Sequence, residues 1–303
     1  MQATKLQKEI LKTLLFFNLH NRPLALKEMH QFLGIKANEA QVFLALMNLV
    51  KKNKVVEKNQ YFVLKNYAKI LQSQKTSELI KEKLIKKAKL FSLLFRITPF
   101  VRGVFLANSL AMGMPKKTSD IDVVVLVKKG RLWIVRFILN LLFLLLGQRR
   151  RKKIKKDPEK FCLSFFAECK TNLQFEKLTE DPLLIYWLAT LQPLIGSKAE
   201  EMFLRENGWI SNFLPNRQLV TIEGKIKALS FLAFLGEKII NLCGNWLEKY
   251  LFQIQARSIK AKNKKDTKLA LPYIYRSYPN GERKKFLNFF NKNYKNLLLN
   301  KKL

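Results

Sequence analysis

The sequence predicts an α/β core with a small mixed sheet, preceded and followed by mainly helical regions. Two observations predict this class: short β-branched and apolar runs surround one long apolar helix in the middle of the chain, and apolar residues recur at helical spacing on both sides. With 303 residues, 48% of them hydrophobic, the chain can bury the cores of two or three domains. We expect four parts, at residues 1–68, 69–97 (a linker helix), 98–172 and 173–303 (a helical region).

The first part of the chain has three helical patterns and one alternating segment. Apolar residues at a spacing of about 3.6 predict helices in KLQKEILKTLLFF, in ALKEMHQFLG, which ends at Gly34, and in NEAQVFLALMNLVKKN. The segment KVVEKNQYFVL alternates and predicts a hairpin that turns near Lys58 and Asn59. Three helices followed by a hairpin resemble a winged helix-turn-helix domain.

DNA binding does not follow from this order alone, because a recognition helix presents polar and basic side chains to the major groove. The third helix is mostly apolar, and it leaves two readings open: contact with nucleic acid, or packing on a neighbouring domain or protein. The residues available for contacts with DNA are Gln41, Asn48, Lys51 and Lys52.

An amphipathic helix at 75–96 links the first part to the core. Its lysines lie on the open face, and Thr76 or Ser77, with Glu78 nearby, is the expected N-cap. The core then begins with the strand VRGVFLA, the turn and short helix NSLAMG, and the strand DIDVVVLV, whose β-branched run indicates full burial.

The apolar segment LWIVRFILNLLFLLLG, at 132–147, is too short to span a bilayer and contains Arg136 and Asn140. We expect a buried helix, packed between the sheet and another element. As a crossover to the strand KFCLSFFAE, it would make that strand parallel to DIDVVVLV. Contact of this helix and the following run RRRKKIKK with an anionic membrane surface is also open.

Asp120 and Asp122 begin the buried strand. A spacing of two places both carboxylates on one face of the strand, about 6.6 to 6.8 Å apart along the backbone. Two carboxylates on one face can share a magnesium ion, which prefers carboxylates and substrate phosphates as ligands.

Ser109 follows the preceding strand at a turn into a helix, where a hydroxyl and backbone N–H groups suit a phosphate. The loop LAMGMPKKTS then leads to Asp120, and in it Lys116 and Lys117 add positive charge. Together these residues predict a site for phosphate and metal.

The serine, the loop and the aspartate pair resemble the nucleotidyltransferase fold of the DNA polymerase beta superfamily. In that family a strand ends in Gly-Gly-Ser or Gly-Ser, a short helix follows, and Asp-x-Asp or Asp-x-Glu opens the next strand. ANSLAMG and TSDIDVVVLV match this pattern in order and separation. The resemblance implies transfer of a nucleoside monophosphate from a magnesium-bound NTP to an acceptor hydroxyl. It implies that Asp120 and Asp122 hold the metal and act in catalysis, and that the triphosphate is bound by Asn108, Ser109, Lys116 and Lys117.

The chain departs from the family pattern at two places. Asn108 stands where the family has glycine; asparagine tolerates the left-handed conformation, but its side chain would crowd a phosphate. The family's third carboxylate has no clear counterpart. The strand KFCLSFFAE offers Glu168 at its end, with Asp157 and Glu159 just ahead of it, and in a parallel arrangement Glu168 lies at the far end from Asp120. Cys162 or Ser164 would occupy its place, and neither is a good ligand for a hard cation.

The net charge of +35 favours polyanionic partners such as RNA, DNA or anionic membrane. Three cysteines and two histidines are too few and too scattered for a disulfide framework or a zinc site, and the N-terminal segment lacks the apolar run of a signal peptide, so we expect a cytoplasmic location. The alternative function is a non-catalytic nucleic-acid-binding protein that combines the winged helix with a degenerate nucleotidyltransferase scaffold.

Overall fold

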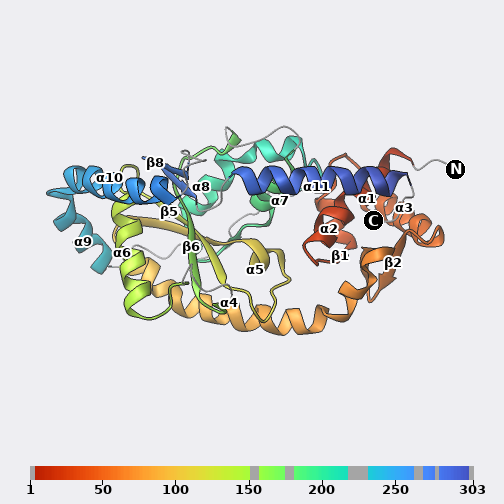
Figure 1. Ribbon diagram of the computed structural model, residues 1–303, viewed down its shortest axis with the longest axis horizontal. Helices are drawn as coiled ribbons and strands as arrows, with labels where there is room; N and C mark the ends of the chain where they lie inside the picture. Colours follow the sequence, from red (N-terminus) through yellow and green to blue (C-terminus); the bar gives the residue numbers. More distant parts are fainter. Residues whose placement is uncertain are drawn as a thin grey trace.

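A computed structural model of the chain is shown in Figure 1. The molecule is elongated, with a small helical unit and its sheet at one end and a larger sheet with its helices at the other (Figure 1). The structure describes residues 4–150, 157–174, 181–217, 231–262, 269–276 and 280–299.

The N-terminal unit has the predicted order of three helices and a hairpin. Its elements are α1 (Lys5–Leu19), β1 (Leu24–Ala25), α2 (Leu26–Gln31), α3 (Glu39–Lys51), β2 (Val55–Lys58) and β3 (Tyr61–Leu64). Asn59 and Gln60 both have positive φ and join β2 to β3 as a two-residue turn, close to the predicted position. The two-residue strand β1, which the sequence did not indicate, pairs with β3 and completes a three-stranded antiparallel sheet.

A long helix connects this unit to the larger sheet. A 3₁₀ helix, η1 (Lys65–Gln72), leads directly into α4 (Gln74–Ile97), which runs along one side of the molecule (Figure 1). The prediction of Thr76 or Ser77 as N-cap is wrong, because the helix begins before both of them. Ser73 holds the cap position, but its hydroxyl donates back to the Ile70 carbonyl of η1 at 3.0 Å and caps no N–H group of α4.

The larger sheet has six strands in the order β7-β4-β5-β6-β9-β8. Strands β5 and β6 are parallel, as predicted from the crossover through α6, and every other pair is antiparallel. The short helix α5 connects β4 to β5. These elements are β4 (Val101–Leu106), α5 (Asn108–Met112), β5 (Ile121–Val127), α6 (Leu132–Leu145), β6 (Phe161–Glu168), β7 (Gln192–Pro193), β8 (Ala270–Leu271) and β9 (Ile274–Arg276).

Alternation along β5 assigns its residues to two separate cores. Val123 and Val125 face the core formed with α4 and α6, whereas Val124 and Leu126 face the opposite side. All seven residues of β5 are buried, as the β-branched run predicts. Asp122 alternates with Val123 and therefore lies on the same side as Val124, toward the C-terminal helices.

The C-terminal region supplies helices to both ends of the molecule. They are α7 (Pro182–Thr190), α8 (Lys198–Glu206), the 3₁₀ helix η3 (Gly208–Asn212), α9 (Phe231–Asn241), α10 (Gly244–Lys262) and α11 (Asn280–Leu298). Helices α7 and α8 cover the face of the sheet that carries Val124, and α10 packs on α6. Helix α11 lies beside α1, where Phe290 contacts Phe16 in the N-terminal core (Figure 1).

The expectation of a purely helical C-terminal region was incomplete, because β7, β8 and β9 come from it and form both edges of the sheet. These strands have two or three residues each, too few to show a period of two.

Helix α6 packs against the sheet through Trp133, Leu139 and Phe143, as expected for a core helix. Its outer face is nevertheless exposed at Phe137 and Leu144, so the helix is not covered on all sides. Within the described ranges, no helix is long and apolar enough to cross a membrane.

Candidate functional site

The predicted site forms at the turn between β4 and α5 and at the start of β5. The Ala107 N–H donates to the Asp122 carbonyl, at 3.0 Å, which places the end of β4 beside the beginning of β5. Asn108 follows with φ 53°, so this asparagine adopts a left-handed conformation, which asparagine tolerates better than most residues. The turn directs the next residue, Ser109, toward the loop that carries Asp120.

Asp120, Asp122 and Cys162 lie together. One ligand atom from each side chain is within 4.8 Å of the other two. Asp122 and Cys162 are direct partners in the parallel register of β5 and β6, and Glu168 pairs with Val127 at the far end. Cys162 therefore takes the place where a third carboxylate was sought, and Glu168 is excluded from it.

The short distance between the Asp120 and Asp122 carboxylates and the burial of Asp122 shift the pKa values of the site. Burial and the neighbouring negative charge of Asp120 raise the pKa of Asp122 to about 6, although hydrogen bonds from Asn108 and Cys162 oppose this shift. Burial, and then the two carboxylates, raise the pKa of the Cys162 thiol to about 12. Cys162 is thus a neutral thiol that donates a hydrogen bond to Asp122 at neutral pH.

Arg150 places a positive charge beside these carboxylates. Its guanidinium Nη1 is 2.9 Å from Asp120 Oδ2 and 3.8 Å from the Cys162 Sγ. Backbone pairing holds this arginine at the site, because the Arg150 N–H donates to the Phe161 carbonyl at the start of β6.

The residues fit a magnesium ion held by two carboxylates. Asp120 Oδ2 is buried and accepts no hydrogen bond from the described residues; its contact with Arg150 is an ion pair without hydrogen-bond geometry. Magnesium is commonly bound by one or two carboxylates together with substrate phosphates and water, so a third protein oxygen is not required. Asp120 and Asp122 would hold the ion, and Cys162 would remain outside its coordination.

The loop between α5 and β5 is tied to the serine of the turn. Ser109 Oγ donates to Ser119 Oγ at 3.4 Å, and Ser119 Oγ accepts the Lys116 N–H at 2.9 Å. Lys116 and Lys117 have exposed side chains, free to approach a phosphate from solvent. Ser109 is therefore hydrogen-bonded to the loop that carries Lys116 and Lys117, two further residues predicted to bind phosphate.

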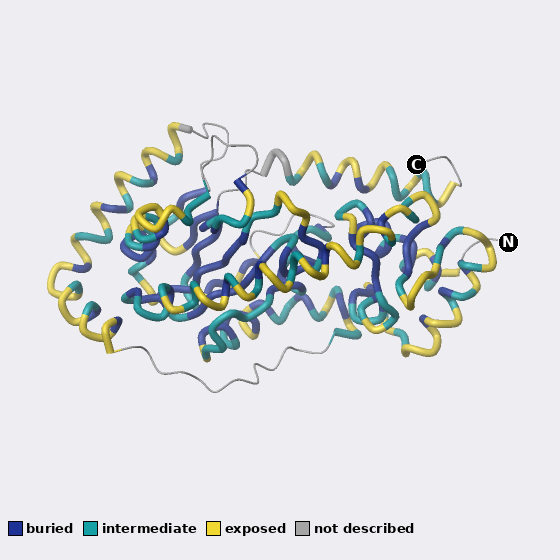
Figure 2. The backbone as a smooth tube through the Cα atoms, turned by 90° about the horizontal axis from the view of Figure 1, so that it is seen from below, coloured by how far each residue is buried: buried dark blue, intermediate teal, exposed yellow. Residues whose placement is uncertain are grey.

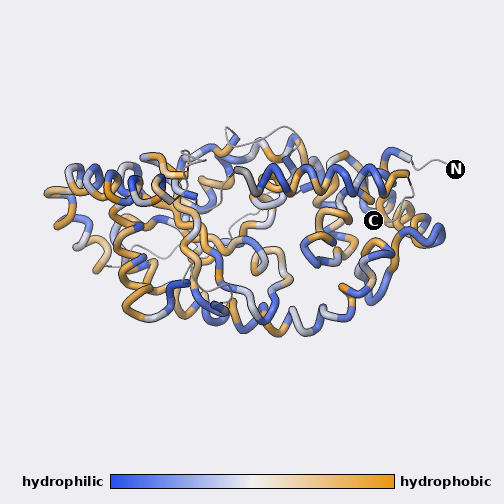
Figure 3. The backbone as a smooth tube through the Cα atoms, viewed as in Figure 1, coloured by the Kyte–Doolittle hydropathy of each residue, from blue (hydrophilic) through white to orange (hydrophobic). Residues whose placement is uncertain are grey.

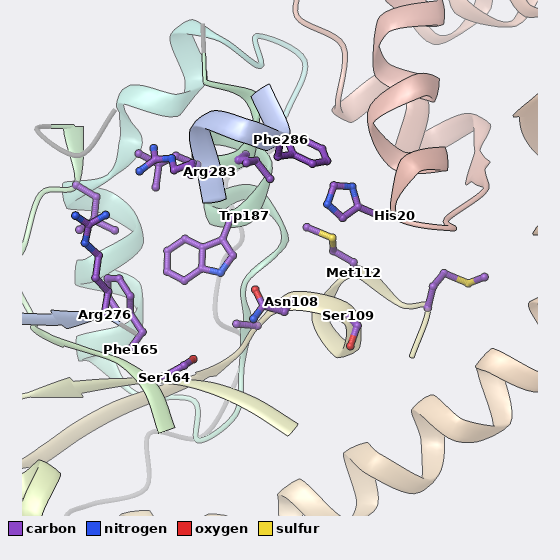
Figure 4. A pocket seen from close by; sticks show the side chains of 15 residues that line it. His20, Asn108, Ser109, Met112, Ser164, Phe165, Trp187, Arg276, Arg283 and Phe286 are labelled. Carbon is purple, nitrogen blue, oxygen red and sulfur yellow. The ribbon is translucent and has the colours of Figure 1, made fainter. Parts of the chain in front are cut away.

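A cavity of about 440 Å³ opens beside Asn108 and Ser109 (Figure 4). Trp187 and Asn108 point into the same space, with His20 on the N-terminal side (Figure 4). The other polar and aromatic lining residues are Ser164, Phe165, Arg276, Arg283 and Phe286. Asn108 is shared, since it lines the cavity and also hydrogen-bonds to Asp122. The cavity and the carboxylate pair are therefore neighbouring parts of one site.

Several charged or titratable side chains around the cavity are buried. It lowers the pKa of His20, whose Nδ1 is 2.8 Å from the Phe16 carbonyl, and this hydrogen bond only partly opposes the shift. Arg276 is buried at the end of β9, and Arg283 pairs with the fully buried Asp181.

Several residues of the site were not singled out from the sequence. In the sequence Arg150 belongs to the basic run after the apolar helix, and nothing in that run distinguishes it from its neighbours. Trp187 and Arg276 come from α7 and β9, far from the motif in sequence. Ser119, by contrast, could have been found from the sequence, because it lies directly before Asp120 in the motif TSDIDVVVLV.

The residues predicted for DNA contact lie on or next to α3. Asn48 accepts a hydrogen bond from Gln7 Nε2 at 2.9 Å, and Gln41 forms a capping box with Asn38. Both polar side chains are therefore engaged within the N-terminal unit. Lys51 and Lys52 are exposed, and the large apolar side chains exposed on the same helix are Phe43 and Leu44.

Comparison of the chain with models of protein families, with curated proteins and with solved structures finds no match in any of the three.

Proposed function

We propose that the protein is a magnesium-dependent nucleotidyltransferase that transfers a nucleoside monophosphate from an NTP to an acceptor hydroxyl. The observation that carries the proposal is the convergence of Asp120 and Asp122 beside the turn at Asn108 and Ser109. A carboxylate pair next to a polar turn is the arrangement that phosphoryl chemistry needs, because the reaction requires positioning and charge stabilisation.

Each residue has a distinct role in this proposal. Magnesium held by Asp120 and Asp122 would polarise the α-phosphate and make the acceptor hydroxyl more acidic. One of the two carboxylates would also assist removal of the proton from the acceptor hydroxyl. Ser109 would donate to the β- and γ-phosphates, and Lys116 and Lys117 would approach their outer oxygens.

The cavity beside Asn108 is large enough for a nucleoside-sized group, since ligand pockets start at roughly 300 Å³. Trp187 and Phe165, whose rings lie 5.1 Å apart, offer aromatic faces on which a base can stack. Asn108, between this cavity and Asp122, would orient the bound group toward the metal.

RNA is one candidate acceptor because the chain is strongly basic, with a net charge of +35. The three free cysteines are compatible with a reducing compartment, and we expect the reaction in the cytoplasm. The alternative, a non-catalytic protein that binds nucleic acid through the N-terminal unit, gains no support from α3, where Gln41 and Asn48 are engaged in hydrogen bonds within the unit.

The test is incubation of the purified chain with magnesium and each NTP labelled at the α-phosphate, with and without cellular RNA and protein. We expect label to be transferred by the wild type and lost in Asp120→Asn and in Asp122→Asn. Glu168→Gln is the matched control, because it removes a carboxylate from the far end of the same strand pair.

Transfer that survives Asp122→Asn would refute the proposed mechanism. Absence of transfer by the wild type, together with duplex binding that weakens steeply as salt increases, would favour the non-catalytic alternative.

A further inference from the structure

One end of the molecule presents apolar side chains to solvent. An amphipathic helix normally buries its apolar face, but α9 exposes it. We use the name α9 surface for the exposed residues Phe231, Leu232, Phe234, Leu235, Ile239, Leu242, Trp246 and Tyr250. Figure 3 shows much of α9 and the neighbouring α6 as hydrophobic, and Figure 2 shows α9 and α10 largely exposed at one end of the molecule.

The inward face of α9 is fixed by polar and close contacts. Glu237 forms hydrogen bonds of 2.6 and 2.8 Å to the Arg102 guanidinium and accepts the Phe100 N–H at 2.9 Å. Gly236 lies against Pro99 so closely that a Cβ there would be 2.6 Å from the Pro99 Cγ. These contacts orient the helix so that Ala233 and Ile240 pack inward and the residues of the α9 surface point away from the sheet.

Two aromatic residues extend the α9 surface onto α10. Trp246 and Tyr250 are exposed, and their rings are stacked with centroids 5.4 Å apart and an interplanar angle of 5°. Trp and Tyr are the residues enriched where protein meets the headgroup region of a bilayer, because each combines an apolar ring with a polar tip.

The exposed charged side chains of α9 and α10 all have the same sign. Glu237 and Glu248 are the acidic residues of α9 and α10, and both point inward; Glu248 accepts the N–H groups of Trp133 and Ile134 at 2.9 and 3.0 Å. The exposed charged side chains described in 231–261 are all positive: Lys238, Lys249, Arg257 and Lys260.

We propose that the α9 surface binds peripherally to an anionic lipid bilayer. Apolar side chains with aromatic and basic neighbours satisfy both requirements of interfacial binding, burial in the acyl boundary and attraction to anionic headgroups. A second copy of the chain fits this surface less well, because pairing through it would bring the like charges of Lys238 and Lys249 together. This inference is independent of the proposed transferase activity.

The test is co-sedimentation of the full chain with vesicles of phosphatidylcholine alone and of equal parts phosphatidylcholine and phosphatidylglycerol. We expect the wild type to prefer the anionic vesicles by about tenfold or more. The double variant Leu232→Glu/Leu242→Glu, at positions 61% and 90% exposed, should bind anionic vesicles at least about tenfold more weakly.

The control is Leu44→Glu/Leu79→Glu, at positions 68% and 62% exposed on α3 and on the first part of α4. It adds the same two negative charges, and helix α3 lies at the opposite end of the molecule from α9 (Figure 1). We expect vesicle binding within about twofold of the wild type, because the apolar insertion is intact.

A fluorescence measurement identifies the face that inserts. Trp246 is 67% exposed, and its emission should shift to shorter wavelength on anionic vesicles, a shift that Trp246→Phe should remove. Equal loss of binding in both double variants would overturn the proposal in favour of diffuse charge attraction. The proposal would also be overturned, in favour of self-association, if the wild type did not bind vesicles and formed dimers that Leu232→Glu/Leu242→Glu separates.

Discussion

The guanidinium of Arg150 lies 2.9 Å from Asp120 Oδ2, on the carboxylate that we propose as a magnesium ligand. A positive side chain at this position neutralises part of the negative charge of the two aspartates. It also competes with a cation for the same oxygen atom, because both are attracted to it over similar distances. Metal binding and this ion pair are therefore coupled.

Arg150→Gln is expected to strengthen magnesium binding in the absence of nucleotide by about three- to tenfold, because the competing charge is removed. Isothermal titration of magnesium into the purified protein measures the change. Arg149→Gln is the matched control, with the same loss of charge at a residue that lines the groove between α6 and α10. Equal gains in both variants would mean that net charge alone is responsible.

Asp122→Asn should stabilise the metal-free protein at neutral pH. The pKa of Asp122 is raised to about 6 from 3.8. Between pH 3.8 and pH 6 the Asp122 carboxyl is therefore more protonated in the native state than in the unfolded state. Stability then falls as pH rises from 3.8 through 6, and above pH 6 the ionised Asp122 costs roughly 3 kcal/mol, about 1.4 kcal/mol for each pKa unit.

Urea unfolding without magnesium at pH 7.5 and at pH 4 checks this prediction. We expect Asp122→Asn to gain on the order of 1–3 kcal/mol at pH 7.5 and almost nothing at pH 4. An Asp122→Asn protein less stable than the wild type at pH 7.5 would contradict it.

Much of the candidate site could be predicted because its signals are local. The alternation of β5, the turn at Asn108 and the parallel register that excludes Glu168 all follow from segments within one stretch of the chain. The coarse α/β class was confirmed for the same reason, since long periodic segments encode their own structure.

The remaining features depend on contacts that no local pattern records. Arg150 reaches Asp120 only because the residues after α6 pair with the start of β6, a bridge recorded at Arg149 and Phe161. Trp187 lines the cavity because α7 packs across the sheet. Helical spacing also cannot tell which way the apolar face of α9 points, because periodicity gives the width of a face and not its direction.

Cys162→Ala should leave magnesium-dependent transfer within about threefold of the wild type, because a neutral thiol contributes little to binding a hard cation. The pKa of this thiol is raised to about 12, and it donates to Asp122 as a neutral group. Cadmium, a soft cation with high affinity for sulfur, should bind more weakly to Cys162→Ala than to the wild type. Loss of magnesium binding in this variant, measured by titration, would show that Cys162 positions the metal ligands.

Glu237→Ala is expected to destabilise the protein by about 2 kcal/mol or more, because it leaves Arg102 and the Phe100 N–H without their common acceptor. Burial opposes ionisation of Glu237, but the hydrogen bonds from Arg102 and the Phe100 N–H, together with the positive charges of Arg102 and Lys128, outweigh burial and lower the pKa of this carboxyl. An acid whose pKa is lowered in the native state stabilises that state at pH values above its unfolded pKa of 4.5. This contribution is lost as the pH falls through the native pKa.

The difference between wild type and Glu237→Ala should therefore be largest near pH 7 and smaller near pH 3, as urea unfolding would measure. Glu201→Ala provides the control, because the Glu201–Arg205 pair on α8 is exposed and should change stability by less than about 0.5 kcal/mol. Equal effects of the two substitutions would mean that Glu237 does not hold α9 against the sheet. In that case the outward direction of the α9 surface would depend on packing of Ala233, Gly236 and Ile240.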